Sequence, residues 1–335
     1  MEDVSDLSFR VICKKMGADI VYTEFIASEG IIRNAKKANR KMIIDDQERP
    51  TAVQIFGSDF NAMIESAKIV EDAGADILDI NFGCWVKKVV NREAGAAFLK
   101  DPERMAELTN KMADVVSIPL TVKTRLGWDR HSIRINEVAK MIEDAGAAAL
   151  AIHCRTRSDG MGGNADWSYL IDVKKNANIP IILNGDVKDH KDAKRAFEMT
   201  NCDAVMVGRG CIGYPFVFKE IKDYLETGIE PSTPDIYLRV NTCLEHLKLN
   251  YDYKGDHGII EFRKHYSGYL KGFYEASPIR QKLMKCKQYD EVESILKEYI
   301  RYLEINNRLE PVSKVRHKAK LSCESEAYIK KQTSE

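Results

Sequence analysis

The sequence predicts an α/β protein, a (β/α)₈ TIM barrel whose first strand is missing or truncated, followed by a small C-terminal helical domain. Seven short runs rich in β-branched residues recur over about 210 residues. Segments with apolar residues at spacings of three and four separate these runs, as expected for helices that face a core. This alternation is typical of a parallel sheet with crossover helices, and it stops after Glu226.

The strands are predicted at residues 20–25, 52–57, 77–83, 120–127, 149–156, 179–187 and 204–208. Helices are predicted between them at residues 61–73, 102–116, 136–145 and 189–199. Gly74 and Gly146 are expected to end two helices in the left-handed conformation. Residues 7–16 have a helical pattern with Asp6 as a cap, so no strand is expected before Ile20. A barrel without that strand exposes two strand edges.

Residues 1–228 are predicted to form the barrel, residues 235–306 the helical domain and residues 307–335 a flexible tail. The whole chain has 51 basic and 51 acidic residues, yet residues 235–335 have 19 basic and 15 acidic ones. From Arg263 to Lys287 there are seven basic residues and one acidic residue, interleaved with aromatic side chains. This pattern suits phosphate binding with base stacking, although a solvated helix face with core aromatics explains it equally well.

Composition excludes several other classes of protein. The zero net charge argues against a uniformly polycationic nucleic-acid coat, and no apolar run is long enough for a membrane span. The eight cysteines are scattered without a Cys-x-x-Cys pair, which argues against a structural zinc site or a disulfide framework. We therefore expect a cytoplasmic monomer with reduced thiols, no metal and no membrane association.

Polar residues follow six successive predicted strands, where the active site of a (β/α)₈ barrel lies. Burying so many polar groups without partners is costly, so a bound polar ligand is expected. The glycines of residues 184–186 and 208–210 indicate a phosphate site, which suits a sugar phosphate, pyridoxal phosphate or flavin mononucleotide. The set comprises Gln54, Asn81, Cys84, Lys123, Arg125, His153, Arg155, Asn184, Gly185, Asp186, Gly208 and Arg209.

Two members of this set have side chains that suit catalysis. Lys123 ends an apolar strand, where its ammonium could stabilise an electron-rich ring carbonyl or form a Schiff base. Cys84 also ends a strand, and the nearby Lys87 and Lys88 could favour its thiolate. Since lone cysteines are mostly structural, position alone does not make Cys84 catalytic.

Taken together, the motifs resemble those of the bacterial-type tRNA-dihydrouridine synthases over about residues 4–306. The motifs that support the resemblance are DLSFR at residues 6–10, RPTAVQIFG at 49–57, DINFGC at 79–84, VKTRLGW at 122–128, HCRTR at 153–157, NGD at 184–186 and GRG at 208–210. The resemblance implies a flavin-bearing barrel and a helical tRNA-binding domain. It also implies NADPH-dependent or NADH-dependent reduction of a uracil C5=C6 bond in tRNA.

The resemblance also implies a role for each residue. Cys84 would be the general acid that protonates uracil C5, while the flavin delivers a hydride to C6. Asn81 and Arg125, and with less support Arg155, would orient the base. Contacts with tRNA are expected from Arg263, His265, Lys271 and Arg280. FMN would be held by Gln54, Lys123, His153, Asn184, Gly185, Asp186, Gly208 and Arg209.

This sequence departs from the family pattern in three places. It lacks the first strand with its Pro-Met pair, Trp85 replaces the usual proline after the cysteine, and Cys154 replaces the usual glycine after the histidine. Two alternatives remain open. One is a non-catalytic RNA-binding protein with weak or lost flavin binding, and the other is a flavin reductase of free pyrimidines.

Overall fold

The computed structural model describes residues 1–311 of the chain. The chain divides into two compact units, Met1–Pro231 and Ser232 onward. Most of the predicted tail, residues 312–335, lies outside the described residues. Within the described part of the chain, no helix is long and apolar enough to cross a membrane.

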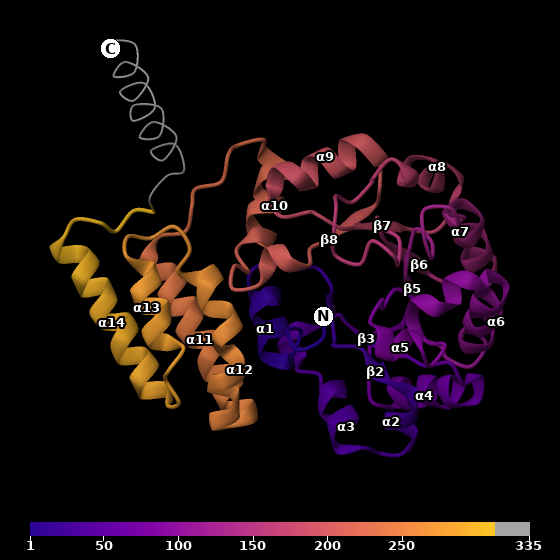
Figure 1. Cartoon of the computed structure of the whole chain (residues 1–335), viewed down its shortest axis with the longest axis horizontal. Coiled ribbons are helices and arrows are strands. Elements are labelled where there is room, and N and C mark those ends of the chain that lie inside the picture. The colour runs from indigo at the N-terminus through magenta and orange to yellow at the C-terminus, as the bar shows by residue number, and fades with distance from the viewer. Residues whose placement is uncertain (312–335) are drawn as a thin grey trace, which may run out of the picture. The chain divides into compact units, whose positions relative to one another are not determined.

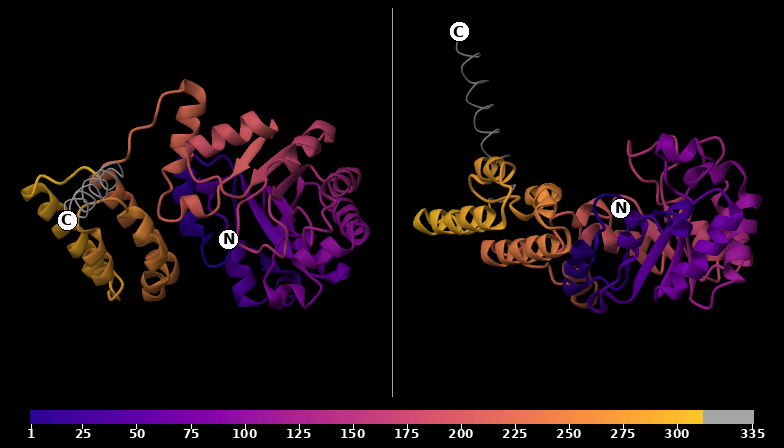
Figure 2. Two further views of the ribbon diagram at one scale, coloured as in Figure 1. Left: turned by 45° about the horizontal axis from the view of Figure 1, so that its top comes forward. Right: turned by 90° about the horizontal axis from the view of Figure 1, so that it is seen from below.

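The first unit is built on a curled parallel sheet with helices around its outside (Figure 1). The two rotated views in Figure 2 show helices on the outside of the same sheet. The strands are β1 (Val21–Tyr22), β2 (Ile26–Ala27), β3 (Thr51–Phe56), β4 (Ile77–Asn81), β5 (Leu120–Arg125), β6 (Ala149–His153), β7 (Ile181–Asn184) and β8 (Ala204–Met206). Every neighbouring pair is parallel, which confirms the predicted α/β class.

Helices and short 3₁₀ turns connect these strands. The helices of this unit are α1 (Leu7–Lys15), α2 (Ser28–Ile32), α3 (Lys36–Met42), α4 (Phe60–Asp72), α5 (Lys87–Val90), α6 (Pro102–Ala113), α7 (Ile135–Asp144), α8 (Tyr169–Asn176), α9 (His190–Thr200) and α10 (Val217–Thr227). The 3₁₀ turns are η1 (Asp46–Glu48), η2 (Gly95–Lys100) and η3 (Arg209–Cys211). Asp6 caps α1 through the Phe9 amide as predicted, and Gly74 and Gly146 have the expected positive φ.

The core explains why the strands are almost continuously apolar. Strand side chains such as Leu78, Ile80 and Val122 are fully buried, because helices cover the outer face of the sheet. Apolar helix side chains such as Met63 and Met105 pack onto the same cluster. The seven cysteines of the described residues are free and buried, in agreement with the prediction, and Cys323 lies outside that part of the chain.

Several predicted strands end earlier than their sequences suggested. The predicted strand at 179–187 stops at Asn184, because Gly185 and Asp186 both have positive φ. Within the predicted strand at 20–25 only Val21–Tyr22 forms a strand, β1, and the short strand β2 follows it; both pair with β3. Between them the Thr23 hydroxyl accepts the Gln54 amide, so a side chain replaces a backbone partner in the ladder.

The sheet is open where the sequence predicted a missing strand. Its order is β1-β3-β4-β5-β6-β7-β8, and no ladder within the described residues joins β8 to β1. The N-terminal segment lies near this opening, and helix α1 packs beside β1 (Figure 1). The barrel is therefore incomplete, with one edge at β1 and the other at β8.

The second unit is helical. Its helices are α11 (Ile236–Lys254), α12 (Asp256–Tyr269), α13 (Ala276–Leu283) and α14 (Tyr289–Ile305). Its core contains the buried side chains of Phe262, Tyr266, Tyr269 and Tyr299. The aromatic residues of the predicted basic segment are thus largely core residues of this unit.

A buried ion pair fixes α1 to η1 within the first unit. Arg10 Nε lies 2.5 Å from Glu48 Oε2, and the two side chains are 3% and 0% exposed. Arg10 also donates to the carbonyls of Ser5 and Ile43, so its guanidinium joins three segments of chain. Removing one partner of such a pair leaves a buried charge without compensation.

We predict that Glu48→Ala lowers the free energy of unfolding by about 3–5 kcal/mol. The double variant Arg10→Met/Glu48→Leu should lose less, because it removes both charges and restores apolar contacts. Denaturant titration followed by circular dichroism measures both values. Lys140→Ala, which breaks the exposed Lys140–Asp144 pair, is the control and should cost less than about 1 kcal/mol. Equal losses in the single and double variants would contradict the assignment of the cost to an uncompensated charge.

Candidate active site

A cavity of about 430 Å³ lies at the carboxyl ends of the strands in the first unit. Strand register brings the side chains together there. Asn81 is the cross-strand partner of Lys123. Arg125 is the partner of His153, which is in turn the partner of Asn184. All the barrel candidates except Cys84 line this cavity, namely Gln54, Asn81, Lys123, Arg125, His153, Arg155, Asn184, Gly185, Asp186, Gly208 and Arg209.

The cavity continues into the opening of the sheet. Its wall there includes Val21 of β1 and Val205 of β8, together with Phe9 of α1 and Phe218 of α10. Because no strand fills this space, an apolar extension is continuous with the polar site. The incomplete barrel therefore enlarges the cavity on the side of β1 and β8.

Lys123 is the buried cation of the site. Its ammonium makes no hydrogen bond or ion pair with any residue between 1 and 311, and it lines the cavity. Burial and, to a lesser extent, the nearby Arg125 lower the pKa of Lys123 to about 8, while Asp79 opposes the shift. A buried ammonium without a partner is costly, so this position suits a ligand that carries negative charge or a hydrogen-bond acceptor.

A chain of buried hydrogen bonds crosses three strands beneath the cavity. Asp79 accepts from Thr121 Oγ1 at 2.6 Å and from Gln54 Nε2 at 2.7 Å. Gln54 Oε1 accepts in turn from Asn81 Nδ2 at 2.7 Å. Since the carboxylate accepts only, it fixes which way the Gln54 amide points, and Gln54 fixes Asn81.

This series of hydrogen bonds ends at Cys84, the candidate general acid. Asn81 Oδ1 accepts the backbone N–H groups of Gly83 and Cys84, each at 3.0 Å. Cys84 is 8% exposed and is not among the described residues that line the cavity. Its thiol pKa is raised by burial, while the Val86 amide and Arg125 oppose the shift. Cys84 thus lies beside the cavity wall, and its backbone amide is held by Asn81 of that wall.

Arg125 joins the loops on either side of its own strand. Its Nε donates to the Gly83 carbonyl at 2.8 Å, and its Nη1 donates to the carbonyls of Thr156 and Gly160. The loop after β4 and the loop after β6 are therefore held by one guanidinium, which itself is 3% exposed. Arg125 is placed to hold the walls as well as to meet a ligand.

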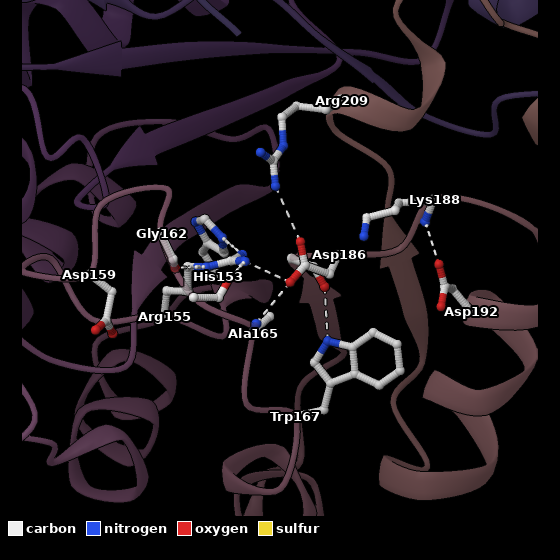
Figure 3. A network of polar contacts seen from close by, with 12 residues as sticks. His153, Arg155, Asp159, Gly162, Ala165, Trp167, Asp186, Lys188, Asp192 and Arg209 are labelled. Carbon is white, nitrogen blue, oxygen red and sulfur yellow. Dashed lines mark hydrogen bonds and ion pairs between the residues drawn. The ribbon is translucent and has the colours of Figure 1, made fainter. Parts of the chain in front are cut away.

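A second network holds the loops after β6, β7 and β8 together (Figure 3). The Asp186 carboxylate accepts from Arg155 Nη2 at 2.6 Å and from the Ala165 amide at 2.8 Å. Its other oxygen lies 3.2 Å from Arg209 Nη2. Arg155 also donates to the carbonyls of Gly162 and Gly163. Arg155 and Asp186 therefore bind each other within the protein. Arg209 also contacts Asp186, but its side chain remains 52% exposed.

His153 is a neutral imidazole in this setting. Burial, together with the cations Lys123, Arg125, Arg155 and Arg209, lowers its pKa to about 2. Its Nε2 lies 3.3 Å from Arg155 Nη1, which suits acceptance of a hydrogen bond by an uncharged ring. His153 can therefore bind a ligand as a neutral donor or acceptor and does not add positive charge.

The two glycine loops lie side by side at the ends of β7 and β8. Gly185 has a φ of +115°, and a Cβ there would lie 2.8 Å from His153 Cδ2, so only glycine fits. A Cβ on Gly210 would lie 3.0 Å from the Lys188 backbone, which shows that the loops are in close contact. Asn184 Nδ2 donates to the Met206 carbonyl and links the two strands. The half-buried Gly208 and the exposed cation of Arg209 suit a phosphate.

The candidates in the helical unit differ in exposure. Lys271 is exposed, Arg280 is half-buried, and half-buried Arg263 donates to the Cys286 carbonyl at 3.1 Å. His265 is only 2% exposed, and its ring packs against Phe262 and His246. This placement suits a packing role for His265 and does not suit direct contact with RNA.

Asp79 and Thr121 were not among the predicted site residues. Both are buried and anchor the hydrogen bonds that lead to Cys84. Strand alternation could have identified Asp79, because Asp79 and Asn81 are two residues apart and must face the same side of β4. The same alternation places Thr121 on the face of Lys123 in β5, but only the register between β4 and β5 shows that it pairs with Asp79.

Comparison with known proteins identifies related sequences. A family model described as dihydrouridine synthase (Dus) matches residues 1–304. A probable tRNA-dihydrouridine synthase of Rickettsia bellii is 39% identical over 282 residues, which cover 84% of this chain and 86% of that protein. The tRNA-dihydrouridine synthase B of Pseudomonas aeruginosa is 36% identical over 291 residues, covering 87% and 88% of the two chains. The structure of histamine dehydrogenase from Rhizobium sp. 4-9 matches with a TM-score of 0.47 and 11% identity, covering 74% of this chain and 46% of that chain.

We predict a pH-dependent difference in stability between the wild type and Asp79→Asn. Burial raises the pKa of the Asp79 carboxyl to about 6 from its ordinary 3.8. Between about pH 4 and pH 6 the folded protein therefore holds a proton that the unfolded chain has lost. Stability falls as the pH rises through this window and is constant above it.

Asparagine does not titrate, and it can still bond to Thr121 and Gln54. The free energy of unfolding of the wild type, relative to that of Asp79→Asn, should therefore fall by on the order of 3 kcal/mol from pH 4 to pH 7. Denaturant unfolding at each pH measures the difference, in which the titrations common to both proteins cancel. A difference that stays constant across this range would show that Asp79 ionises at its ordinary pKa in the folded protein.

Proposed function

The chain belongs to the dihydrouridine synthase family, and we propose that it is an FMN-dependent oxidoreductase that reduces the C5=C6 bond of a uridine in tRNA. The observation that carries this proposal is the single cavity at the strand ends. There an unpartnered ammonium, a neutral imidazole and two adjacent glycine loops come together. The names of the relatives support tRNA as the substrate, and the residues of the cavity suit a flavin and a uracil base.

The residues around the cavity fit FMN. Lys123 would meet the electron-rich part of the ring, where its ammonium stabilises negative charge. The backbone of Gly185 and Gly208 and the side chain of Arg209 would bind the phosphate. Gln54, His153, Asn184 and Asp186 would complete this set, with Gln54 and Asp186 acting through partners that they already hold. Bound in this way, FMN would supply the hydride for uracil C6, with NADPH or NADH as the source of electrons.

Cys84 would protonate uracil C5. Because burial raises its pKa, the thiol remains protonated at neutral pH, as a general acid must. The hydrogen bonds from the Gly83 and Cys84 amides to Asn81 place this thiol next to the cavity wall. Proton delivery then requires the side chain to turn into the cavity when the base enters.

The remaining candidates would bind RNA. Arg125 and Asn81 line the cavity and would orient the base, and Arg155 would support the loop beside it. In the helical unit, Lys271, Arg263 and Arg280 would bind phosphates, while His265 would pack among the aromatic rings. Since the target uridine is part of folded RNA, it must be extruded to reach the cavity, at a cost of a few kcal/mol.

The proposed activity is tested with the full-length protein and tRNA transcribed in vitro, which carries uridine at every target position. We expect the purified protein to be yellow, to release FMN on denaturation and to form dihydrouridine when NADPH is added. Mass spectrometry of the digested tRNA measures the product. A colourless protein that binds tRNA would favour the non-catalytic alternative. Equal rates with free uracil and tRNA would favour a reductase of free pyrimidines.

We predict that Cys84→Ala lowers the rate of dihydrouridine formation by about 100-fold or more, because a positioned general acid contributes about 10²–10⁴. Bound flavin and tRNA affinity should be unchanged, since the backbone amide of residue 84 still reaches Asn81. Cys84→Ser should also be slow, because an alcohol is a much weaker acid than a thiol.

Cys202→Ala is the matched control, because Cys202 is buried and does not line the cavity. It should retain the wild-type rate. Unchanged turnover in Cys84→Ala would exclude this thiol as the acid and leave the family membership intact.

A further inference from the structure

The segment that follows Cys84 carries a large exposed aromatic side chain. Trp85 is 40% exposed, and its neighbour Val86 is 46% exposed. The indole lies against Gly160: a Cβ built there would be 3.4–3.7 Å from three of its ring carbons. One part of the ring is thus supported by backbone while the rest remains available to solvent. An indole held in this way is a preformed surface for stacking.

This indole lies next to the cavity. Gly160 precedes Met161, which is 41% exposed and lines the cavity, and the Gly160 carbonyl accepts from Arg125 in the cavity wall. On the other side Trp85 is bonded directly to Cys84. A planar group that leaves the cavity beside Cys84 would therefore meet the ring of Trp85.

Three cations accompany the indole. Lys87 and Lys88 of α5 and Arg92 just after it are exposed. None of the three makes an ion pair with the described residues. Other surface cations of this unit, such as Lys111, Arg134 and Lys140, do form ion pairs with carboxylates. Their positive charge is consequently available to an external anion.

The acidic groups nearby are mostly neutralised. Glu93 lies 3.7 Å from Arg104, and Asp159 lies 3.2 Å from Arg130. Glu29 borders the same surface hollow as Arg92, and so does Arg33, which is exposed and without an ion pair in the described part of the chain. The electrostatic balance of this surface is therefore positive, although the chain as a whole has no net charge.

We propose that Trp85, Lys87, Lys88 and Arg92 form a tRNA-binding surface on the barrel itself. In this surface, named the Trp85 surface, the indole stacks on a nucleobase next to the extruded uridine and the three cations bind phosphates. The identity of the ligand rests on the proposed function, and the surface extends it by naming residues outside the helical unit. An exposed aromatic ring beside unpaired cations is the combination that single-stranded nucleic acid recognises.

The energetic contributions of ring and charge can be separated. Base–aromatic stacking is worth about 1–3 kcal/mol, which corresponds to about 5-fold to 150-fold in affinity. Each phosphate neutralised by a cation contributes about 0.7–0.9 to the slope of log affinity against log salt. The ring should therefore change affinity with little change in slope, whereas the lysines should change the slope.

The test uses the full-length protein, an in vitro tRNA transcript and fluorescence anisotropy at several salt concentrations. Trp85→Ala should weaken binding by about 5-fold to 150-fold, and Trp85→Phe should recover most of the loss. Lys87→Ala/Lys88→Ala should reduce the salt slope by about 1.4–1.8. Tryptophan fluorescence should be quenched by tRNA in the wild type and less so in Trp85→Phe.

The matched control is Lys68→Ala/Lys175→Ala. These two exposed lysines also have no ion pair in the described residues, and they lie near the carboxyl ends of α4 and α8. In a parallel α/β unit those helix ends lie on the face opposite the strand ends, so this variant has the same net charge but leaves the Trp85 surface intact. It should keep the wild-type salt slope.

The results distinguish this proposal from the proposed function. Wild-type affinity in Trp85→Ala, or equal slopes in the two lysine double variants, would overturn the Trp85 surface even if dihydrouridine is formed. Weaker tRNA binding in Trp85→Ala, with no flavin or dihydrouridine in the wild type, would support the surface and refute the reductase.

Discussion

The hydrogen bonds that run from Thr121 through Asp79, Gln54 and Asn81 to the Cys84 amide are the constraint on which the geometry of the site depends. Each buried amide in this chain could point either way in isolation. Because a carboxylate can only accept, Asp79 removes that freedom at the start of the chain. The position of the Cys84 backbone thus depends on Asp79. This residue lies two positions before Asn81 in β4 and is not among the described residues that line the cavity.

The same principle explains why so many charged groups can lie at one end of the sheet. Arg125 holds the loops after β4 and β6, and Asp186 joins those after β6, β7 and β8. These residues satisfy one another and thereby make the walls rigid. Lys123 stands apart because no described residue pairs with its ammonium. The contrast identifies which polar groups build the site and which one is left to meet a ligand.

Sequence periodicity predicted much of this architecture, because strand runs and helix spacings are local properties. It identified the parallel sheet, the open edge before Ile20 and the strand ends that line the cavity. It did not predict that Arg155 and Asp186 bind each other, that Cys84 lies beside the cavity wall, or that His265 is buried among aromatic rings. These features depend on strand register and on helix packing, which bring together residues far apart in the chain. Strand alternation could have placed Asp79 and Thr121 on the site face, but not the hydrogen bond between them, which depends on register.

The open edge of the sheet has a consequence for how the site can recognise a large substrate. Between β8 and β1 the cavity wall is largely apolar, and its cations Arg10 and Lys222 are paired with Glu48 and Asp19. Three exposed cations without an ion pair in the described residues cluster after β4, where α5 follows Cys84. A polyanion should therefore approach from the α5 side, because three exposed cations cluster there, whereas Arg155 at Asp186 is buried and paired. Pairing within the protein thus decides where a chain of zero net charge can attract nucleic acid.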